Sequence, residues 1–210
     1  MAFFSSQSQS QYDSPTAFSA VSKRLESPSA ERNKDSIWTV LSTKVISNLL
    51  RDQPWTILET AAGAGVHTEY FASKLLLERN KNGDSQSLSL SQPPPFVWHA
   101  TDPTEEALQS IVARVQEHKD ISDVVAAPKR LTLDDSGICQ SESSSDSAPE
   151  HPLDLVLSIN MIHIAPWEAT LGLMKVAGEG LREPSGESDG GYLYCYGPYR
   201  QEGIIVPSNE

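Results

Sequence analysis

The sequence has few cysteines and no paired metal-ligand motif. Cys139 and Cys195 are its two cysteines, no Cys-x-x-Cys is present, and the five histidines lack the spacing of metal ligands. We therefore expect no metal site and no disulfide framework. This pattern is typical of a reduced intracellular protein.

Clusters of lysine and arginine and long apolar runs are also missing. With 16 basic and 28 acidic residues, the net charge is −12. An acidic surface repels phosphate backbones, so we expect no nucleic-acid partner. No apolar run approaches membrane-spanning length, and the start lacks the charged and apolar regions of a signal peptide. We expect a cytoplasmic protein without a membrane partner. A mitochondrial or plastid transit peptide is the alternative for the Ser/Gln-rich start.

The composition divides the chain into a tail and one domain. Residues 1–25 are rich in Ser and Gln without apolar periodicity, which predicts a disordered tail. Residues 26–210 are long enough for a single domain with its own core. Two polar stretches, 79–95 and 135–151, interrupt that domain, and we expect them to be mobile insertions.

Within the domain, short apolar runs alternate with segments of helical periodicity. Such alternation predicts an α/β fold in which a mostly parallel sheet is covered by helices on both faces. The expected strands are 55–60, 96–101, 130–133, 153–159 and 192–196, and the expected helices are 36–50, 66–78, one from Pro103 and Thr104 onward, and 167–181.

The run from Ile57 to Gly65 is the most informative stretch. An apolar strand ends near Glu59, turns through Gly63 and Gly65, and opens into an amphipathic segment. Strand, glycine turn and helix together begin a nucleotide-binding α/β unit. A carboxylate before the glycines repels a pyrophosphate but suits a cationic amino-acid group. The acid before the glycine turn therefore favours S-adenosyl-L-methionine (SAM) over a dinucleotide as the cofactor.

Four polar residues stand at expected strand ends, namely Glu59, Asp102, Asp134 and Asn160. Parallel strands bring their carboxyl ends to one edge of the sheet, where ligands bind. We expect Glu59 to orient the turn or meet the SAM ammonium through water, and Asp102 to bind the ribose hydroxyls. Asp134 would accept from the adenine amine, and Asn160 would lie beside the sulfonium. Each residue has a plainer alternative, as a helix cap or as part of a turn.

Four longer motifs resemble the methyltransferase-like 26 family, a SAM-dependent class I methyltransferase group. The similarity spans about Ser27 to Asn209. The motifs are residues 27–34 (SPSAERNK), Glu59-x-x-x-Gly63-x-Gly65-x-His67, residues 160–170 (NMIHIAPWEAT), and residues 196–199 (YGPY) followed by Gly203 and residues 207–209 (PSN).

The resemblance implies a Rossmann-like class I methyltransferase three-layer sandwich. Ala61 stands where this class often has its first glycine. The chain stops at Glu210, where family members continue, so we expect a C-terminally truncated form. The presence of the last two strands of the class is left open.

Three further expectations concern catalysis. Transfer of the sulfonium methyl needs alignment and exclusion of water more than a general base. His163 and Tyr199 are the candidate catalytic residues, although a lone histidine in this setting is more often structural. The N-terminal segment is expected to fold over the cofactor as a lid. Arg32 or Asn33 would then reach the methionine carboxylate. This carboxylate needs a hydrogen-bond donor, and Glu59 cannot supply one.

Two other functions compete with a methyltransferase. An NAD(P)-dependent oxidoreductase is disfavoured because Thr68 replaces the third glycine of the usual fingerprint. A non-catalytic interaction protein with the methyltransferase fold is the stronger alternative, given the early stop at Glu210. The methyl acceptor, whether a small molecule or a protein, and the oligomeric state are not readable from the sequence.

Overall fold

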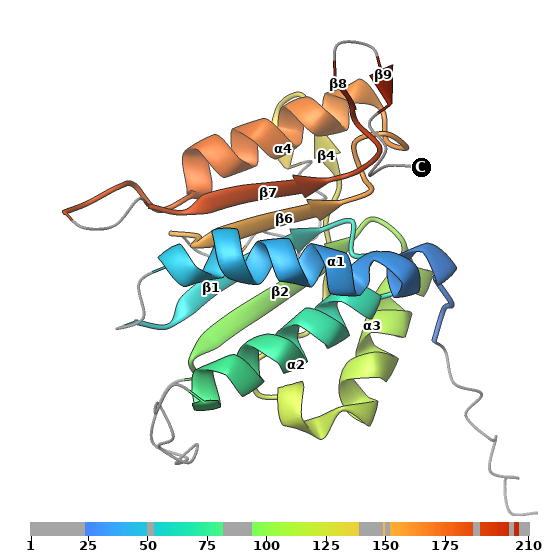
Figure 1. Cartoon of the computed structure of the whole chain (residues 1–210). Coiled ribbons are helices and arrows are strands. Elements are labelled where there is room, and N and C mark those ends of the chain that lie inside the picture. Colours follow the sequence, from blue (N-terminus) through green and yellow to red (C-terminus); the bar gives the residue numbers. More distant parts are fainter. Residues whose placement is uncertain are drawn as a thin grey trace, which may run out of the picture.

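The fold is built on a five-stranded sheet whose paired strands all run parallel (Figure 1). This computed structural model describes residues 24–49, 53–81, 94–138, 149, 152–186, 190–201 and 204–205. The strand order is β3-β2-β1-β6-β7. The strands are β1 (Trp55–Thr60), β2 (Phe96–Asp102), β3 (Lys129–Arg130), β6 (Leu155–Ile159) and β7 (Tyr192–Tyr196).

Helices cover both faces of the sheet (Figure 1). The helices are α1 (Pro28–Lys44), α2 (Val66–Lys81), α3 (Glu105–Glu117) and α4 (Trp167–Gly180), with short 3-10 turns η1 (Ile46–Asn48) and η2 (Lys119–Ile121). Helices α1, α2 and α3 lie on one side of the sheet, and α4 lies on the other. Two short antiparallel hairpins complete the described elements, β4 (Leu133–Asp134) with β5 (Gly137–Ile138) and β8 (Arg200–Gln201) with β9 (Ile204–Ile205).

Strand alternation divides the buried side chains into two clusters. Ile57, Leu155 and Leu157 point toward α1 and α2, where they join Trp38 and Phe71 in the larger cluster. The other face is smaller. Its buried residues include Leu58 and Val156 from the central strands and Leu173 and Val176 from α4. The sheet is therefore sandwiched between two helical layers, as the sequence predicts.

The strand order reverses between β1 and β6. From β1 the chain moves outward to β2 and β3, and it then returns to the other side of β1 to form β6 and β7. In open parallel sheets, ligands bind outside the carboxyl ends of the strands at such a reversal. The Rossmann-like α/β three-layer sandwich with a mostly parallel sheet, expected from the sequence, is confirmed.

Two predicted elements differ from the structure. The strand expected over residues 130–133 is the short β3 at Lys129–Arg130, and Asp134 belongs to the separate β4–β5 hairpin, which packs on α4. Gly172 permits this packing, because a Cβ there would lie 2.2 Å from the Asp134 carbonyl oxygen. The first helix begins at Pro28 rather than Ser36, because proline is well suited to a first helical turn. It ends at Lys44 rather than at residue 50, and the chain continues in the 3-10 turn η1.

The expected tail and insertions fall largely outside the described residues. Residues 1–23, 82–93 and 139–148 are not described. Where the chain is described at their margins, Arg79 lies in α2 and residues 137–138 form β5. Leu25, expected in the tail, donates its backbone N–H to the Ser110 hydroxyl at 2.8 Å.

Candidate functional site

The glycine turn after β1 has two glycines with different roles. Both adopt the left-handed backbone region, with φ of +55° at Gly63 and +78° at Gly65. A Cβ on Gly65 would lie 2.9 Å from Cγ1 of Ile111, so Gly65 lets α2 and α3 pack closely. A Cβ on Gly63 would meet nothing within 4 Å. The space above Gly63 is therefore open to a ligand. Ala61, in place of the usual first glycine, also has a positive φ of 52°.

Asp102 ends β2 beside this turn. Its Oδ2 accepts a hydrogen bond from the Gly63 backbone N–H at 2.9 Å. Its Oδ1 accepts from the backbone N–H of Thr104 at 2.9 Å and from the Thr104 hydroxyl at 2.8 Å. The carboxylate thus fixes the turn and the start of α3. Each carboxylate oxygen has two lone pairs, so Asp102 keeps acceptor capacity for a ligand hydroxyl.

Glu59 lies beneath the turn, with 1% of its surface exposed. Its Oε2 accepts from the Thr68 hydroxyl at 2.6 Å and from the Trp98 indole N–H at 2.9 Å. These bonds connect β1 to α2 and β2, which is the orienting role considered from the sequence. Burial raises the pKa of Glu59 from 4.5 to about 7; the two hydrogen bonds oppose this rise and the nearby Asp102 charge adds to it.

At the carboxyl end of β6, the turn that follows the strand brings the two candidate catalytic residues together. Asn160 adopts a positive φ of 59° and donates its backbone N–H to the Tyr196 carbonyl at 2.7 Å. His163 follows in this turn and is exposed. A Cβ on Gly197 would lie 3.4 Å from both His163 Nδ1 and Tyr199 Cζ. His163 and Tyr199 therefore flank the same glycine after β7. Burial raises the pKa of Tyr199, and nearby Cys195 adds to the rise.

The sequence predicts Asp134 at the end of a main-sheet strand, and this prediction is wrong. Asp134 lies in β4, where Oδ1 accepts from the Ser136 backbone N–H at 2.8 Å and from the Ser136 hydroxyl at 2.5 Å. The error comes from the length of the third strand. Lys129 and Arg130 pair with Thr101 and Asp102, after which the chain leaves the main sheet.

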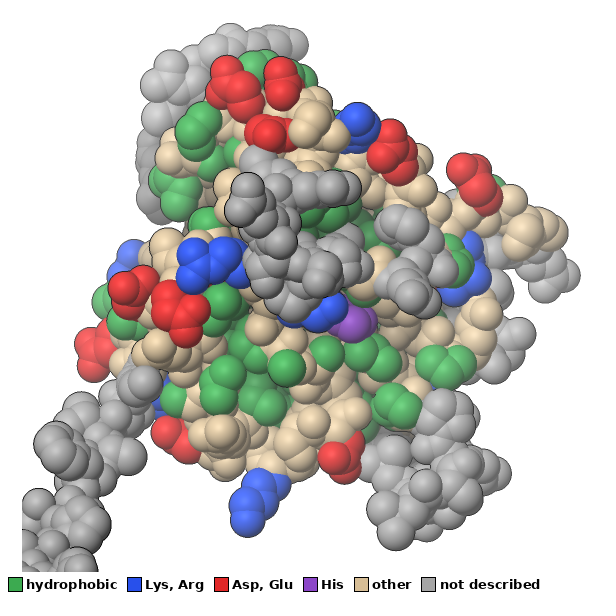
Figure 2. Space-filling view, turned by 180° about the vertical axis from the view of Figure 1, so that it is seen from behind, with side chains coloured by type: hydrophobic (Ala, Val, Ile, Leu, Met, Phe, Trp, Pro, Cys, Tyr) green, Lys and Arg blue, Asp and Glu red, His purple; other side chains and the backbone are tan. Residues whose placement is uncertain are grey.

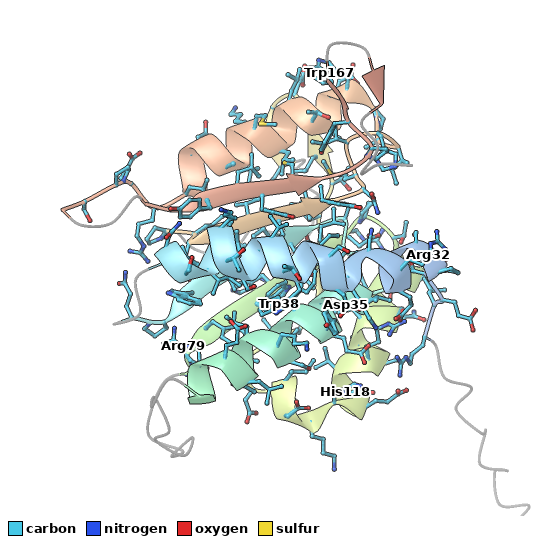
Figure 3. The ribbon with its side chains drawn as sticks, in the orientation of Figure 1. Arg32, Asp35, Trp38, Arg79, His118 and Trp167 are labelled. Carbon is cyan, nitrogen blue, oxygen red and sulfur yellow. The ribbon has the colours of Figure 1, made fainter. Side chains whose placement is uncertain are left out.

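The N-terminal helix reaches the same edge of the sheet. The arrowheads of the strands and the first turns of α1 lie on the same side, and Arg32 is labelled there (Figures 1 and 3). Arg32 is exposed. Asn33 Oδ1 lies 2.9 Å from Nε2 of His67, which is buried in the first turn of α2. Burial lowers the pKa of His67 to about 4, so the imidazole is neutral at pH 7. The rest of α1 is packed into the core through Ile37 and Leu41.

A buried arginine behind the glycine turn was missed from the sequence. Arg114 donates from Nε to the Ala64 carbonyl at 2.7 Å, from Nη1 to Glu69 at 2.6 Å, and from Nη2 to the Leu25 carbonyl at 2.9 Å. Ser110 donates to the same Ala64 carbonyl at 2.8 Å. The turn is therefore held from behind by α3. One feature of the sequence could have identified Arg114. It lies three residues after Ile111, which places a charged side chain on the apolar face of the helix.

The arrangement suits a nucleoside cofactor with an amino-acid part. The open space over Gly63 admits close approach to the backbone, and the adjacent Asp102 has one acceptor position left, on Oδ2, for a ligand hydroxyl. The residues present thus fit SAM. Among the described residues, no three His, Cys, Asp or Glu side chains gather as a metal site. Within the same part of the chain, no helix has the length and apolar character needed to cross a membrane.

Comparisons with known proteins give one family and two distant structural likenesses. A DszA carbon methyltransferase is 16% identical, with a TM-score of 0.41 over 72% of this chain and 33% of that one. A SAM-dependent methyltransferase from Aquifex aeolicus is 15% identical, with a TM-score of 0.40 over 73% of this chain and 64% of that one. The chain thus spans less than two thirds of either protein. A family model matches residues 24–210, and the chain therefore belongs to the family described as protein of unknown function (DUF938).

Proposed function

We propose that this chain is a SAM-dependent methyltransferase. The observation that carries the proposal is the open backbone at Gly63, which lies beside the Asp102 carboxylate at the reversal of strand order. Gly65 is explained by its packing against α3. At Gly63 the φ of +55° favours glycine, but among the described residues no packing contact does. A ligand above Gly63 gives a second reason for the glycine, because any side chain there would occupy the ligand's space.

The cofactor-binding residues in this proposal come from both halves of the sheet. Gly63 and Gly65 form the turn under the methionine part, and Asp102 accepts from the ribose. Asn160 closes the site from the side of β6, and Asp134 remains our proposal for the adenine. Arg32 or Asn33 supplies the donor for the carboxylate. Arg32 is the better candidate, because Asn33 is already engaged with His67.

When bound, SAM supplies an electrophilic methyl group on a sulfonium centre. The chain's own residues orient the cofactor and the acceptor and exclude water from the site. His163 and Tyr199 flank Gly197, where the His163 imidazole would accept a proton from an acceptor nucleophile. Tyr199, whose pKa is raised, keeps its phenol proton and would position the acceptor by donating a hydrogen bond. Tyr199 also offers an aromatic face to the acceptor.

The acceptor is proposed to be a small molecule or a protein. On the face shown in Figure 2, the basic side chains of the described residues are scattered among acidic ones rather than gathered along a groove. Such a surface, with the net charge of −12, supports an acceptor other than nucleic acid. Membership of the methyltransferase-like 26 family is part of the same proposal, and rests on the sequence motifs.

Replacement of Gly63 by valine tests the proposal, with Gly186 as a matched control. The two glycines have nearly equal backbone strain, with φ of +55° and +56°, and in both a Cβ meets nothing within 4 Å. Gly186 precedes the first residue of β7, whereas the proposed site lies at the carboxyl ends of the strands. We expect Gly63→Val to lose SAM binding in calorimetry, and Gly186→Val to retain it with a similar loss of stability. Equal SAM affinity in both folded variants contradicts the proposed site.

The alternative functions give different results with the same protein. Mass spectrometry of the purified chain should detect copurifying S-adenosylhomocysteine, and calorimetry should show binding of SAM but not of NAD. Binding of NAD alone favours an oxidoreductase. Binding of neither compound, by a chain that is folded by circular dichroism, favours an interaction protein.

A further inference from the structure

Helix α4 exposes a row of large apolar side chains to solvent. Trp167, Leu171 and Met174 are 64%, 42% and 47% exposed, although the opposite side of the helix is buried against the sheet. Figure 3 shows Trp167 at the start of α4, on the outer side of the helix. We call these three residues together with Gly178 the α4 seam. Exposed apolar residues that adjoin one another on a single helix commonly mark an interaction surface.

The α4 seam has the spacing of a helix–helix contact. Its members are separated by four, three and four residues, which is the repeat that keeps one stripe of a helix facing a partner helix. Gly178 is exposed, and a Cβ there would meet nothing within 4 Å. The seam therefore has a large indole at one end and an open notch at the other.

Charged residues follow the seam along one flank. Glu168, Lys175 and Glu179 are all exposed, and each lies one position after a seam residue. Glu168 and Lys175 are seven residues apart and hence on the same side of the helix. The stem of Lys175 also lies along the β4–β5 hairpin, since a Cβ on Gly137 would be 3.5 Å from its Cδ. This flank thus has an acid near the start of α4, a base in its second half, and the acid Glu179 beyond that base.

We propose that the α4 seam binds the α4 seam of a second copy of this chain, with the two helices antiparallel about a two-fold axis. In this register, Trp167 of each copy covers the notch at Gly178 of the other. Leu171 packs against Met174 across the axis. On the flank, Glu168 of each copy lies opposite Lys175 of the other.

Self-complementarity is what favours a second copy over an unrelated partner. A two-fold contact uses the same patch twice, so every feature on one half must find its counterpart on the same patch. In antiparallel helix pairs, equivalent flanks face each other, which places acid against base here. In a parallel pair, Trp167 would lie opposite Trp167 and Gly178 opposite Gly178. The large side chain would then no longer lie opposite the open notch.

The contact is small, and this sets the expected affinity. A stable protein–protein complex usually buries roughly 1,600 Å² in total. Four seam residues and one charged flank per copy make a smaller interface than that. We therefore expect a reversible dimer with a dissociation constant in the micromolar range. Two mirrored ion pairs at the rim affect the choice of partner more than the strength of binding.

Sedimentation velocity of the full chain across micromolar concentrations tests the proposal. The wild type should pass from monomer to dimer. Leu171→Glu should raise the dissociation constant by at least about 10-fold, because a carboxylate cannot be buried in the centre of the seam. Leu77 on α2 is the matched control, as it is 54% exposed and lies outside the seam. Leu77→Glu should leave the dimer unchanged.

Charge exchange and the glycine test the register. Glu168→Lys alone, or Lys175→Glu alone, should weaken the dimer several-fold, and the double exchange should restore it. Gly178→Leu should weaken the dimer while raising helical stability, because the leucine fills the notch that receives Trp167. A wild-type chain that stays monomeric at about 100 µM overturns the proposal, since a micromolar dimer would be mostly formed there. A dimer that responds equally to Leu171→Glu and Leu77→Glu, or that is not restored by the double exchange, also overturns it.

Discussion

Arg114 holds the carbonyl oxygen of Ala64 from behind the glycine turn, at 2.7 Å from its Nε. Its side chain is only 6% exposed, and methionine fills similar space without its three hydrogen bonds. Ser110 still satisfies the Ala64 carbonyl, and Glu69 keeps His118 at 2.6 Å and Arg24 at 3.4 Å. We therefore predict that Arg114→Met lowers the free energy of unfolding by about 1–3 kcal/mol in total, through the lost ion pair with Glu69 and the lost bond to the Leu25 carbonyl. Urea denaturation measures it.

Arg130 supplies the comparison for Arg114. It pairs with Glu105 at 3.3 Å, but both side chains are about half exposed. Arg130→Met should change the free energy of unfolding by less than about 0.5 kcal/mol. If the two substitutions have the same effect, Arg114 does not hold the turn in the way its contacts indicate.

Glu59 should make the protein less stable as pH rises. Its pKa is raised from 4.5 to about 7 in the folded chain, so the folded state binds the proton more tightly than the unfolded state. The stabilisation is complete below pH 4.5 and is lost as pH rises through 7. It amounts to up to about 1.4 kcal/mol per pH unit within that window. Glu59→Gln keeps an acceptor for Thr68 and Trp98 and should remove this slope, as measured by urea unfolding at several pH values.

His67 should have the opposite pH dependence. Its pKa is lowered from 6.5 to about 4, so its contribution to stability is present above pH 6.5 and lost as pH falls through 4. Between pH 4.5 and 6.5 the two residues oppose each other, and the wild-type profile should be nearly flat there. His67→Gln should make stability fall with rising pH, whereas Glu59→Gln should make it rise. Parallel profiles for the two variants would show that neither group titrates as described.

Asp102 should affect cofactor affinity more than its neighbour Thr104 does. Asp102→Asn places an amide in the position of a carboxylate that accepts from Gly63 and Thr104. We expect SAM affinity to fall tens-fold, which corresponds to roughly 2–3 kcal/mol. Thr104→Val removes only the hydroxyl bond and should leave the affinity nearly unchanged. If both variants lose stability and neither loses affinity, then Asp102 acts only as a cap for the turn.

The central elements were predictable because their signals are local. The bounds of β1 and β7 agree with those expected from the sequence, and α4 ends one residue earlier than expected. The apolar run, the glycine turn and the proline before α4 each lie within a few residues of the element they define. Gly65 was identified in this way as part of the turn, although the reason for it, Ile111, lies on another helix.

The parts that were missed depend on contacts between distant segments. Arg114 has partners 45 to 89 residues earlier in the chain, so periodicity in α3 gives no sign of them. In α3 the apolar Val112 is 37% exposed, while the polar Ser110 and Arg114 are buried. The third strand was predicted to be too long, because the apolar Leu133 is typical of a strand that continues. In the structure, Leu133 pairs instead with Ile138 in a separate hairpin.

The position of β6 in the sheet has a consequence for the order of assembly. Ile57 pairs with Trp98 on one side and with Leu155 on the other, so the second pairing closes a loop of roughly 100 residues. During synthesis, the N-terminal half can fold as a βαβαβ unit before β6 leaves the ribosome. The glycine turn and Asp102 are then formed early, and Asn160 and His163 join them last. A chain stalled before β6 would therefore carry half of the proposed site, with the edge of β1 still open to mispairing.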